Sequence, residues 1–160
     1  MKTPAFLLTL AALACSAFAE APKPLDDLRK TLSAAGKEQK MAFVILGRPA
    51  CGNCNATKAL IRDGKIPVTA DAYVMADLNT DDAKTQAEFM RKFSKESFGN
   101  TLPFVVVTDA RGKALASSSG YKSAEQWTAL LEEAKTKAAA KPAAPGAGGV
   151  SIFKTPPAGQ

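Results

Sequence analysis

Two cysteines separated by two residues, Cys51 and Cys54, are the side chains of this sequence best suited to chemistry. The motif Cys51-Gly52-Asn53-Cys54 follows an apolar run and a Gly-Arg-Pro-Ala break, which predicts that it begins a helix. Cysteines on one helical turn can close a disulfide with little movement, and a helix N-terminus stabilises a thiolate on the first. We therefore expect Cys51 to attack disulfides and Cys54 to resolve the mixed disulfide.

The same spacing also occurs in zinc sites and in structural disulfides. Zinc needs about four ligands, commonly Cys and His. The chain has 3 Cys, of which the third is Cys15, and no His. We expect neither a metal nor a cofactor, and mechanisms with a His base or a Cys–His dyad are excluded. A permanent disulfide would close a very short loop and constrain the unfolded chain little. Redox chemistry is therefore the favoured interpretation, and a structural role for the disulfide remains the alternative.

Residues around the motif are candidates for supporting roles. Gly52 allows a partner's backbone to approach closely, and Asn53 fills the other position between the cysteines. Arg48 and Lys58 are nearby cations that either stabilise the thiolate or are ordinary surface charges.

Apolar spacing predicts alternating helices and strands around the motif. The strand expected over 41–46 is apolar without alternation, which favours burial on both faces. Pro24 and Gly36 are expected to mark the start and end of the first helix, and Ser123 and Gln126 to form a capping box. Helices are expected over 25–35, 51–63, 81–93 and from 123 onward, and further strands over 72–78, 104–107 and 113–117.

The first nineteen residues resemble a secretory signal peptide. A short positive start precedes an apolar stretch, and Ala17 and Ala19 supply the small residues before an expected cleavage site at Glu20. Cleavage before Cys15 instead would leave a lipid anchor on that cysteine. We expect a periplasmic or secreted protein, with lipid anchoring to the envelope as the alternative.

Composition divides the remainder into one domain and a tail. Residues 20–137 suit a single globular domain, whereas residues 138–160 are rich in Ala, Pro and Gly and predict a flexible tail. The apolar run 150–153 either docks on a surface or is featureless. No run of 18 apolar residues predicts a transmembrane helix. The net charge of +6 is spread along the chain, so we expect no nucleic-acid partner.

The order of these segments resembles the thioredoxin superfamily. The resemblance covers about residues 25 to 137 and includes the CxxC motif, Thr101-Leu102-Pro103 before a Val-rich strand, and the Gly120-Tyr121 bend. It implies an α/β thioredoxin-like fold, with a central mixed β-sheet of about four strands flanked by helices. It also implies that Pro103 is cis and packs against the disulfide, and that the main chain of Leu102 pairs with a substrate peptide by strand-like hydrogen bonds.

The sequence also departs from the family pattern. Ile45 stands where thioredoxins carry a buried Asp, so the usual proton acceptor for the resolving thiol is missing and Asp77 is a candidate substitute. The Gly52-Asn53 pair lacks both the Pro of reductases and the His of strong oxidants. Without a His the thiolate loses one common stabiliser, which favours a reductase or a weak exchanger. Because the first helix is expected almost at the mature N-terminus, the family's first strand is expected to be absent.

Three functions follow from this reading. The favoured one is an exported thiol–disulfide oxidoreductase that acts on protein or small-molecule disulfides together with a redox partner protein. The second is a redox-inert binding protein with a thioredoxin fold and a structural disulfide. The third is an envelope lipoprotein or secreted scaffold in which residues 150–153 matter most.

Overall fold

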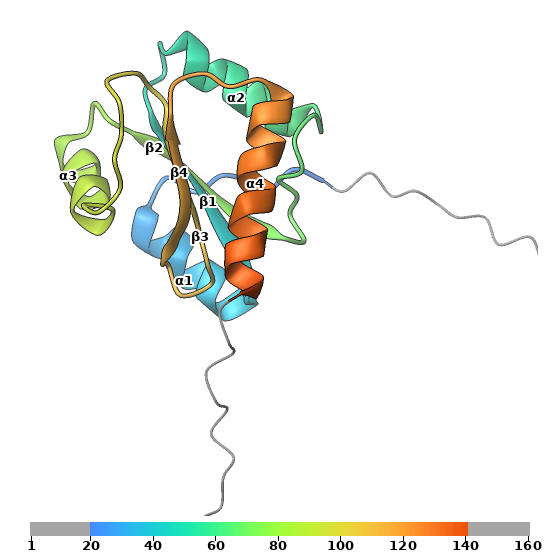
Figure 1. Cartoon of the computed structure of the whole chain (residues 1–160). Coiled ribbons are helices and arrows are strands. Elements are labelled where there is room, and N and C mark those ends of the chain that lie inside the picture. Colours follow the sequence, from blue (N-terminus) through green and yellow to red (C-terminus); the bar gives the residue numbers. More distant parts are fainter. Residues whose placement is uncertain (1–19, 141–160) are drawn as a thin grey trace, which may run out of the picture.

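The computed structural model describes residues 20–140 of the chain. The expected signal segment 1–19, with Cys15, and residues 141–160, with the apolar run 150–153, lie outside the described residues. Helices and strands alternate along the described chain (Figure 1). Their order is α1 (Leu28–Glu38), β1 (Met41–Gly47), α2 (Gly52–Arg62), β2 (Tyr73–Asn79), α3 (Ala83–Lys92), β3 (Phe104–Thr108), β4 (Ala114–Ser119) and α4 (Ala124–Ala139).

The four strands form one mixed sheet in the order β2-β1-β3-β4. Strand β1 pairs in parallel with β2 and antiparallel with β3, and β3 pairs antiparallel with β4. The strand that carries the chain into the CxxC motif is therefore central. The expected α/β thioredoxin-like fold, with a mixed sheet of four strands flanked by helices, is confirmed.

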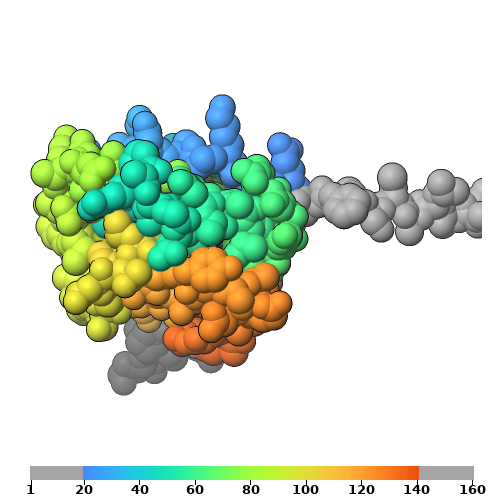
Figure 2. Space-filling view, turned by 90° about the horizontal axis from the view of Figure 1, so that it is seen from above, coloured from blue at the N-terminus to red at the C-terminus, as the bar shows by residue number. Residues whose placement is uncertain are grey.

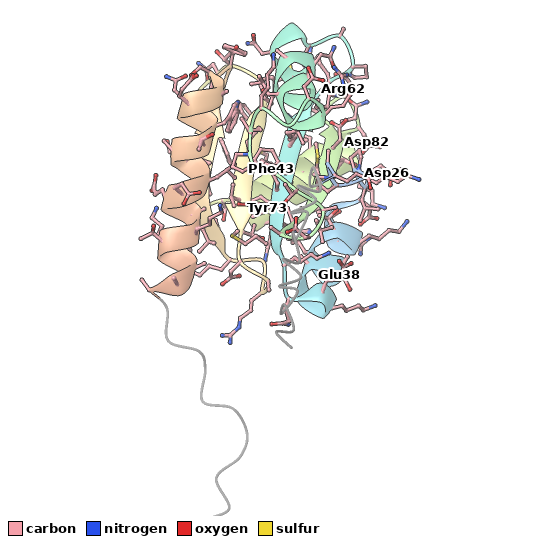
Figure 3. The ribbon with its side chains drawn as sticks, turned by 90° about the vertical axis from the view of Figure 1, so that its right-hand side faces the viewer. Asp26, Glu38, Phe43, Arg62, Tyr73 and Asp82 are labelled. Carbon is pink, nitrogen blue, oxygen red and sulfur yellow. A yellow bond between two sulfur atoms is a disulfide. The ribbon has the colours of Figure 1, made fainter. Side chains whose placement is uncertain are left out.

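Strand β1 is buried on both faces, as its unbroken apolar run predicts. Phe43 and Ile45 pack into a core on the side of α2 and α4, and Val44 and Leu46 pack into a second core with α1 and α3. Figure 3 shows Phe43 in the space between the sheet and α4. The end of β1, and so the motif that follows it, is held by packing from two sides.

The first helix begins later than expected. Asp27, not Pro24, is the N-cap: its side chain accepts a hydrogen bond from the N–H of Lys30 at 2.9 Å. Leu25 instead lies along β2, where its N–H donates to Met75 O at 2.9 Å and its carbonyl accepts from Asp77 N at 2.9 Å. Among residues 20–140 no strand precedes α1, and Leu25 forms only a one-residue parallel bridge with Ala76 at the β2 edge of the sheet.

The first helix also ends later than expected. It continues through Gly36 to Glu38, and Gln39 ends it in the left-handed conformation, with φ 54°. Gly36 serves packing rather than termination, because a Cβ at this position would lie 3.1 Å from the carbonyl oxygen of Ala110. Its missing side chain lets α1 approach the turn between β3 and β4.

The remaining helix ends agree with local sequence signals. Asp82 caps α3 by accepting from Thr85 N at 2.7 Å, and Ser123 and Gln126 form the expected capping box. Helix α4 continues to Ala139, and Ala138 packs against the core. None of the helices within residues 20–140 has the length and hydrophobicity that a bilayer-spanning segment needs.

Candidate active site

The two cysteines of the motif are joined as a disulfide at the start of α2. The sulfur–sulfur distance is 2.13 Å and the Cα atoms lie 5.2 Å apart. The two side chains differ in access: Cys51 is half-buried, whereas Cys54 is only 1% exposed. An incoming thiol or thiolate can therefore reach Cys51 and not Cys54. The expected attacking role of Cys51 and resolving role of Cys54 require such unequal exposure, and the roles themselves stay a prediction.

Cys51 occupies the N-cap position of α2. Its sulfur accepts a hydrogen bond from the N–H of Cys54 at 3.1 Å, and its carbonyl accepts from Asn55 N at 3.1 Å. A side-chain acceptor at an N-cap satisfies one of the unpaired N–H groups of the first helical turn. After reduction, a thiolate here would receive the same N–H group and the positive end of the helix dipole. The position therefore favours the nucleophilic form of Cys51.

Gly47 is a residue of the site that the sequence analysis did not single out. A Cβ built on this glycine would lie 2.7 Å from the sulfur of Cys54 and 3.2 Å from its Cβ. The main chain at the end of β1 thus packs directly against the buried sulfur, and no larger residue fits without displacement. A glycine that ends a buried strand four residues before the motif was the available signal.

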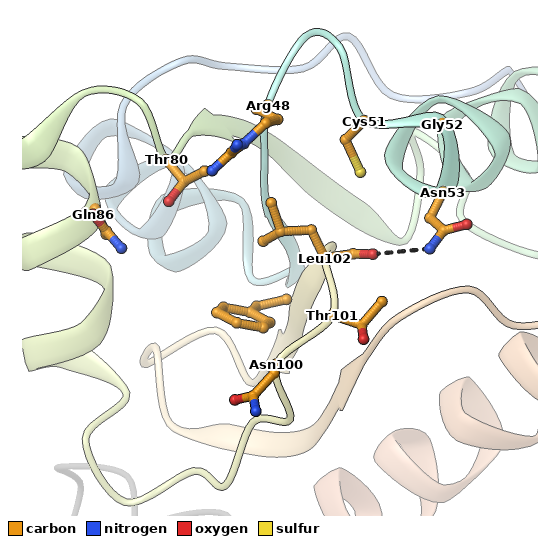
Figure 4. A pocket seen from close by; sticks show the side chains of 10 residues that line it. Arg48, Cys51, Gly52, Asn53, Thr80, Gln86, Asn100, Thr101 and Leu102 are labelled. Carbon is orange, nitrogen blue, oxygen red and sulfur yellow. Dashed lines mark hydrogen bonds between the residues drawn. The ribbon is translucent and has the colours of Figure 1, made fainter.

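The loop before β3 forms the opposite side of the site. The Leu102–Pro103 peptide bond is cis, as expected from the resemblance, and Pro103 is buried directly before β3. The side-chain amide of Asn53 donates to the carbonyl oxygen of Leu102 at 3.3 Å. This bond joins the first turn of α2 to a segment 49 positions away in sequence (Figure 4).

An open groove of about 590 Å³ lies between these segments. Residues from three separate parts of the chain line it, and Figure 4 shows them around Cys51. Arg48 is the charged residue of this lining, and Leu102 and Phe104 contribute apolar side chains to it. From above, the segments coloured for residues near 50, 100 and 120 form one continuous surface (Figure 2). The lining residues are Arg48, Cys51, Gly52, Asn53, Thr80, Gln86, Asn100, Thr101, Leu102 and Phe104.

Asp77 and Lys58 form an ion pair behind the motif. The ammonium nitrogen of Lys58 lies 3.0 Å from Oδ2 of Asp77, and both side chains are about one-third exposed. Asp77 pairs in register with Ile45, the position where the family carries its buried Asp. Asp77 and Lys58 line a small cavity of about 150 Å³ together with Gly47, which also packs against Cys54. Asp77 therefore shares a cavity with Gly47, the residue that packs against the sulfur of Cys54.

The other supporting candidates lie at the groove. Arg48 lines it beside Cys51, and its Nε is 3.5 Å from Oδ1 of the exposed Asp81. Gly52 is exposed, and a Cβ built on it would meet no atom within 4 Å. A partner thus has room at Gly52. Of the two expected cations, Arg48 lines the groove, whereas Lys58 forms an ion pair with Asp77.

The groove contains residues that sequence reasoning missed. Thr80 and Gln86 come from the region of β2 and α3, and Asn100 and Thr101 precede the cis-Pro loop. No local pattern marks these polar residues, because they reach the site only when the strands pair. Within residues 20–140, no group of three Cys, Asp or Glu side chains is arranged to hold a metal ion.

Thioredoxins are among the solved structures with a similar fold. A thioredoxin from Nicotiana alata is 14% identical, with a TM-score of 0.51, covering 72% of this chain and 94% of its own. A thioredoxin mutant from Halobacterium salinarum is 15% identical, with a TM-score of 0.51, covering 71% and 92%. Spinach chloroplast thioredoxin f is 14% identical, with a TM-score of 0.50, covering 76% and 97%. At these identities the likeness concerns the fold.

The sequence itself matches a family model. No curated protein sequence matches the chain. The model of the thioredoxin-like domain, however, matches residues 28–135, which include both cysteines, the cis-Pro loop and all four strands. The fold, the closed CxxC disulfide and this match agree, and the chain belongs to the thioredoxin-like domain family, with the CxxC disulfide of thiol–disulfide oxidoreductases.

Proposed function

We propose that the chain is an exported thiol–disulfide oxidoreductase that works as a reductase or a weak exchanger on protein or small-molecule disulfides. The observation that carries this proposal is the inequality of the two sulfurs. Cys51 lies half-buried in a groove at the N-cap of α2, and Cys54 is 1% exposed behind it. A purely structural disulfide needs no such groove.

The reaction proceeds by two thiol–disulfide exchanges. In the reduced chain, the Cys51 thiolate attacks one sulfur of the substrate disulfide, which forms a mixed disulfide and releases one substrate thiolate. Cys54 loses its proton and attacks the sulfur of Cys51, which releases the second substrate thiolate. Two electrons have then passed to the substrate, and the chain holds the Cys51–Cys54 disulfide described above. A dithiol reductant, small or protein, must restore the reduced form.

The proton of Cys54 needs an acceptor in the second step. We propose that the Asp77–Lys58 pair takes this part, directly or through water in the adjoining cavity. The pair lines the same cavity as Gly47 and is partly exposed, so a proton can pass on to solvent. Asp77 is a positioning or proton-accepting residue here, and the sulfur chemistry belongs to the cysteines.

The proposal of a reductase or weak exchanger rests on the residues between the cysteines. Neither Gly52 nor Asn53 carries a charge, and the chain has no His to stabilise the Cys51 thiolate further. A less stabilised thiolate makes the reduced form less favoured, which makes it the better electron donor. Export rests on the sequence pattern of residues 1–19, and Cys15 keeps lipid anchoring as the alternative.

The deciding measurement is the reduction potential of the Cys51–Cys54 pair in the chain 20–160, together with turnover of insulin disulfides by dithiothreitol. We expect a potential near that of thioredoxin, about −270 mV, and catalysed insulin reduction. The double variant Cys51→Ser, Cys54→Ser is the control for uncatalysed exchange. A potential well below about −300 mV without turnover would instead assign a structural disulfide in a redox-inert binding protein.

A further inference from the structure

The hydrogen bond between Asn53 and Leu102 crosses the groove in which Cys51 lies. The Asn53 amide nitrogen is 3.3 Å from the Leu102 carbonyl oxygen, and both residues line the groove (Figure 4). The main-chain carbonyl of Asn53 accepts a bond from the hydroxyl of buried Thr57 at 3.0 Å, which anchors the helical turn from which the Asn53 side chain reaches Leu102. A donor fixed on a helical turn loses little freedom when it binds.

The Leu102 carbonyl is also the acceptor that an extended polypeptide needs here. Within residues 20–140, no main-chain N–H donates to this oxygen. The next residue, Pro103, has no N–H with which it could donate to a substrate strand. A substrate strand laid beside Leu102 would bind by main-chain hydrogen bonds, as when a peptide adds to a sheet edge. Asn53 approaches the oxygen from inside the same groove, so a polypeptide N–H arriving there must share this acceptor with the amide or displace the amide from it.

We propose that Asn53 is a specificity-determining residue that disfavours extended polypeptides relative to small disulfides. A polypeptide N–H must either share the Leu102 carbonyl oxygen with the Asn53 amide, which weakens its own bond, or displace the amide from it. A small disulfide without a peptide N–H reaches Cys51 and leaves the Asn53–Leu102 bond in place. This inference rests on the proposed function and assigns small thiols and disulfides as the preferred substrate class of that site.

The expected size of the effect follows from the bond that is exchanged. A typical net hydrogen bond corresponds to about a two- to tenfold change in affinity, and this one is long. We expect removal of the Asn53 donor to favour a polypeptide over a small disulfide by about threefold.

The test compares Asn53→Leu, which keeps the shape of the side chain and removes its donor, with the unaltered chain 20–160. Two substrates are used: insulin, and bis(2-hydroxyethyl) disulfide, which has no N–H group. The ratio of kcat/KM for insulin to that for the small disulfide is the readout, because a change in Cys51 reactivity alters both terms. We expect this ratio to rise about threefold through a lower KM for insulin.

Asn55→Leu is the matched control. Asn55 lies on the same helix and its amide donates to the carbonyl of Pro49 at 3.1 Å, outside the groove lining. Its loss removes an equivalent bond near the motif and should leave the ratio unchanged. Asn53→Ala repeats the test if the leucine variant does not fold.

The outcomes separate the two proposals. An unaltered chain that turns over both substrates, with an equal or lower ratio in the Asn53 variants, contradicts the role of Asn53 alone. A chain that turns over neither substrate contradicts the proposed function, and the role of Asn53 fails with it. A rise of the same size in Asn55→Leu also overturns the inference, because the effect is then not specific to the Leu102 carbonyl.

Discussion

The Cα of Gly47 faces the sulfur of Cys54 so closely that a Cβ would lie 2.7 Å from it. This contact joins the end of the central strand to the buried half of the disulfide. The last residue of β1 is thereby part of the redox site. Neither residue can change size without moving the other, since β1 is packed on both faces.

Gly47→Ala should destabilise the protein. The added methyl group must displace Cys54 or the end of β1, and overpacking of this kind costs about 1–3 kcal/mol. Urea unfolding of the oxidised chain measures the loss. Gly52→Ala is the matched control, because a Cβ there meets no atom within 4 Å and alanine favours the helix. Equal stability of the two variants would contradict the close contact at Gly47.

Cys54→Ser should trap mixed disulfides with substrates, and Cys51→Ser should not. The half-buried Cys51 can attack without Cys54, but only Cys54 lies where it can release the bound substrate. Non-reducing gels of each variant after incubation with insulin, followed by mass spectrometry of the adducts, give the measurement. Equal trapping by both variants would remove the assignment of attacking and resolving roles.

Asp77→Asn should slow the release of substrate from the mixed disulfide. We expect loss of this proton acceptor to reduce the rate about tenfold near neutral pH. The effect is small for acid–base catalysis because the Asp77–Lys58 pair is partly exposed and water can also accept the proton. At higher pH the rate should recover, as the Cys54 thiol ionises without help. Quenched-flow measurement of the resolving step across pH tests both points.

Asp63→Asn is the control for the loss of one negative charge. Asp63 pairs with Arg62 at the other end of α2, at 3.0 Å and on the surface. The rate of this variant should follow that of the unaltered chain at every pH. A pH profile of Asp77→Asn that keeps the unaltered shape would show that Asp77 takes no proton in this step.

Tyr73 should make stability fall at high pH. Burial at the start of β2, with the negative charge of Glu132 as a second cause, raises the pKa of Tyr73 from 10.0 to about 12. Figure 3 shows the side chain beneath Phe43, on the side of α4. Because the folded state disfavours the phenolate, this contribution is complete below pH 10 and is lost as pH rises from 10 towards 12.

The measurement for Tyr73 is a comparison of the chain with Tyr73→Phe. Between pH 10 and 12, the free energy of unfolding of the unaltered chain should fall by up to about 3 kcal/mol relative to that of the variant. Urea titrations at several pH values give both curves. Parallel curves over this interval would show that Tyr73 ionises equally in the folded and unfolded states.

Local patterns were sufficient for the elements and for the cysteines. The unbroken apolar run of β1 predicts burial on both faces, and the Ser123–Gln126 capping box predicts the start of α4. The spacing of Cys51 and Cys54 already permitted a disulfide on one helical turn. These features depend on residues close in sequence, because capping and apolar spacing act through local interactions that need no distant segment.

Tertiary structure decided where α1 begins and which residues surround the disulfide. The apolar spacing of the first helix includes Leu25, yet the N–H and carbonyl of Leu25 pair with the edge of β2. The helix therefore begins only after Asp27, which caps it. Asn53 and Leu102 are 49 positions apart, and Gly47 meets Cys54 only because β1 ends beneath the first turn of α2. Strand pairing and loop packing create these contacts, and the energy of each depends on partners that no local window of sequence contains.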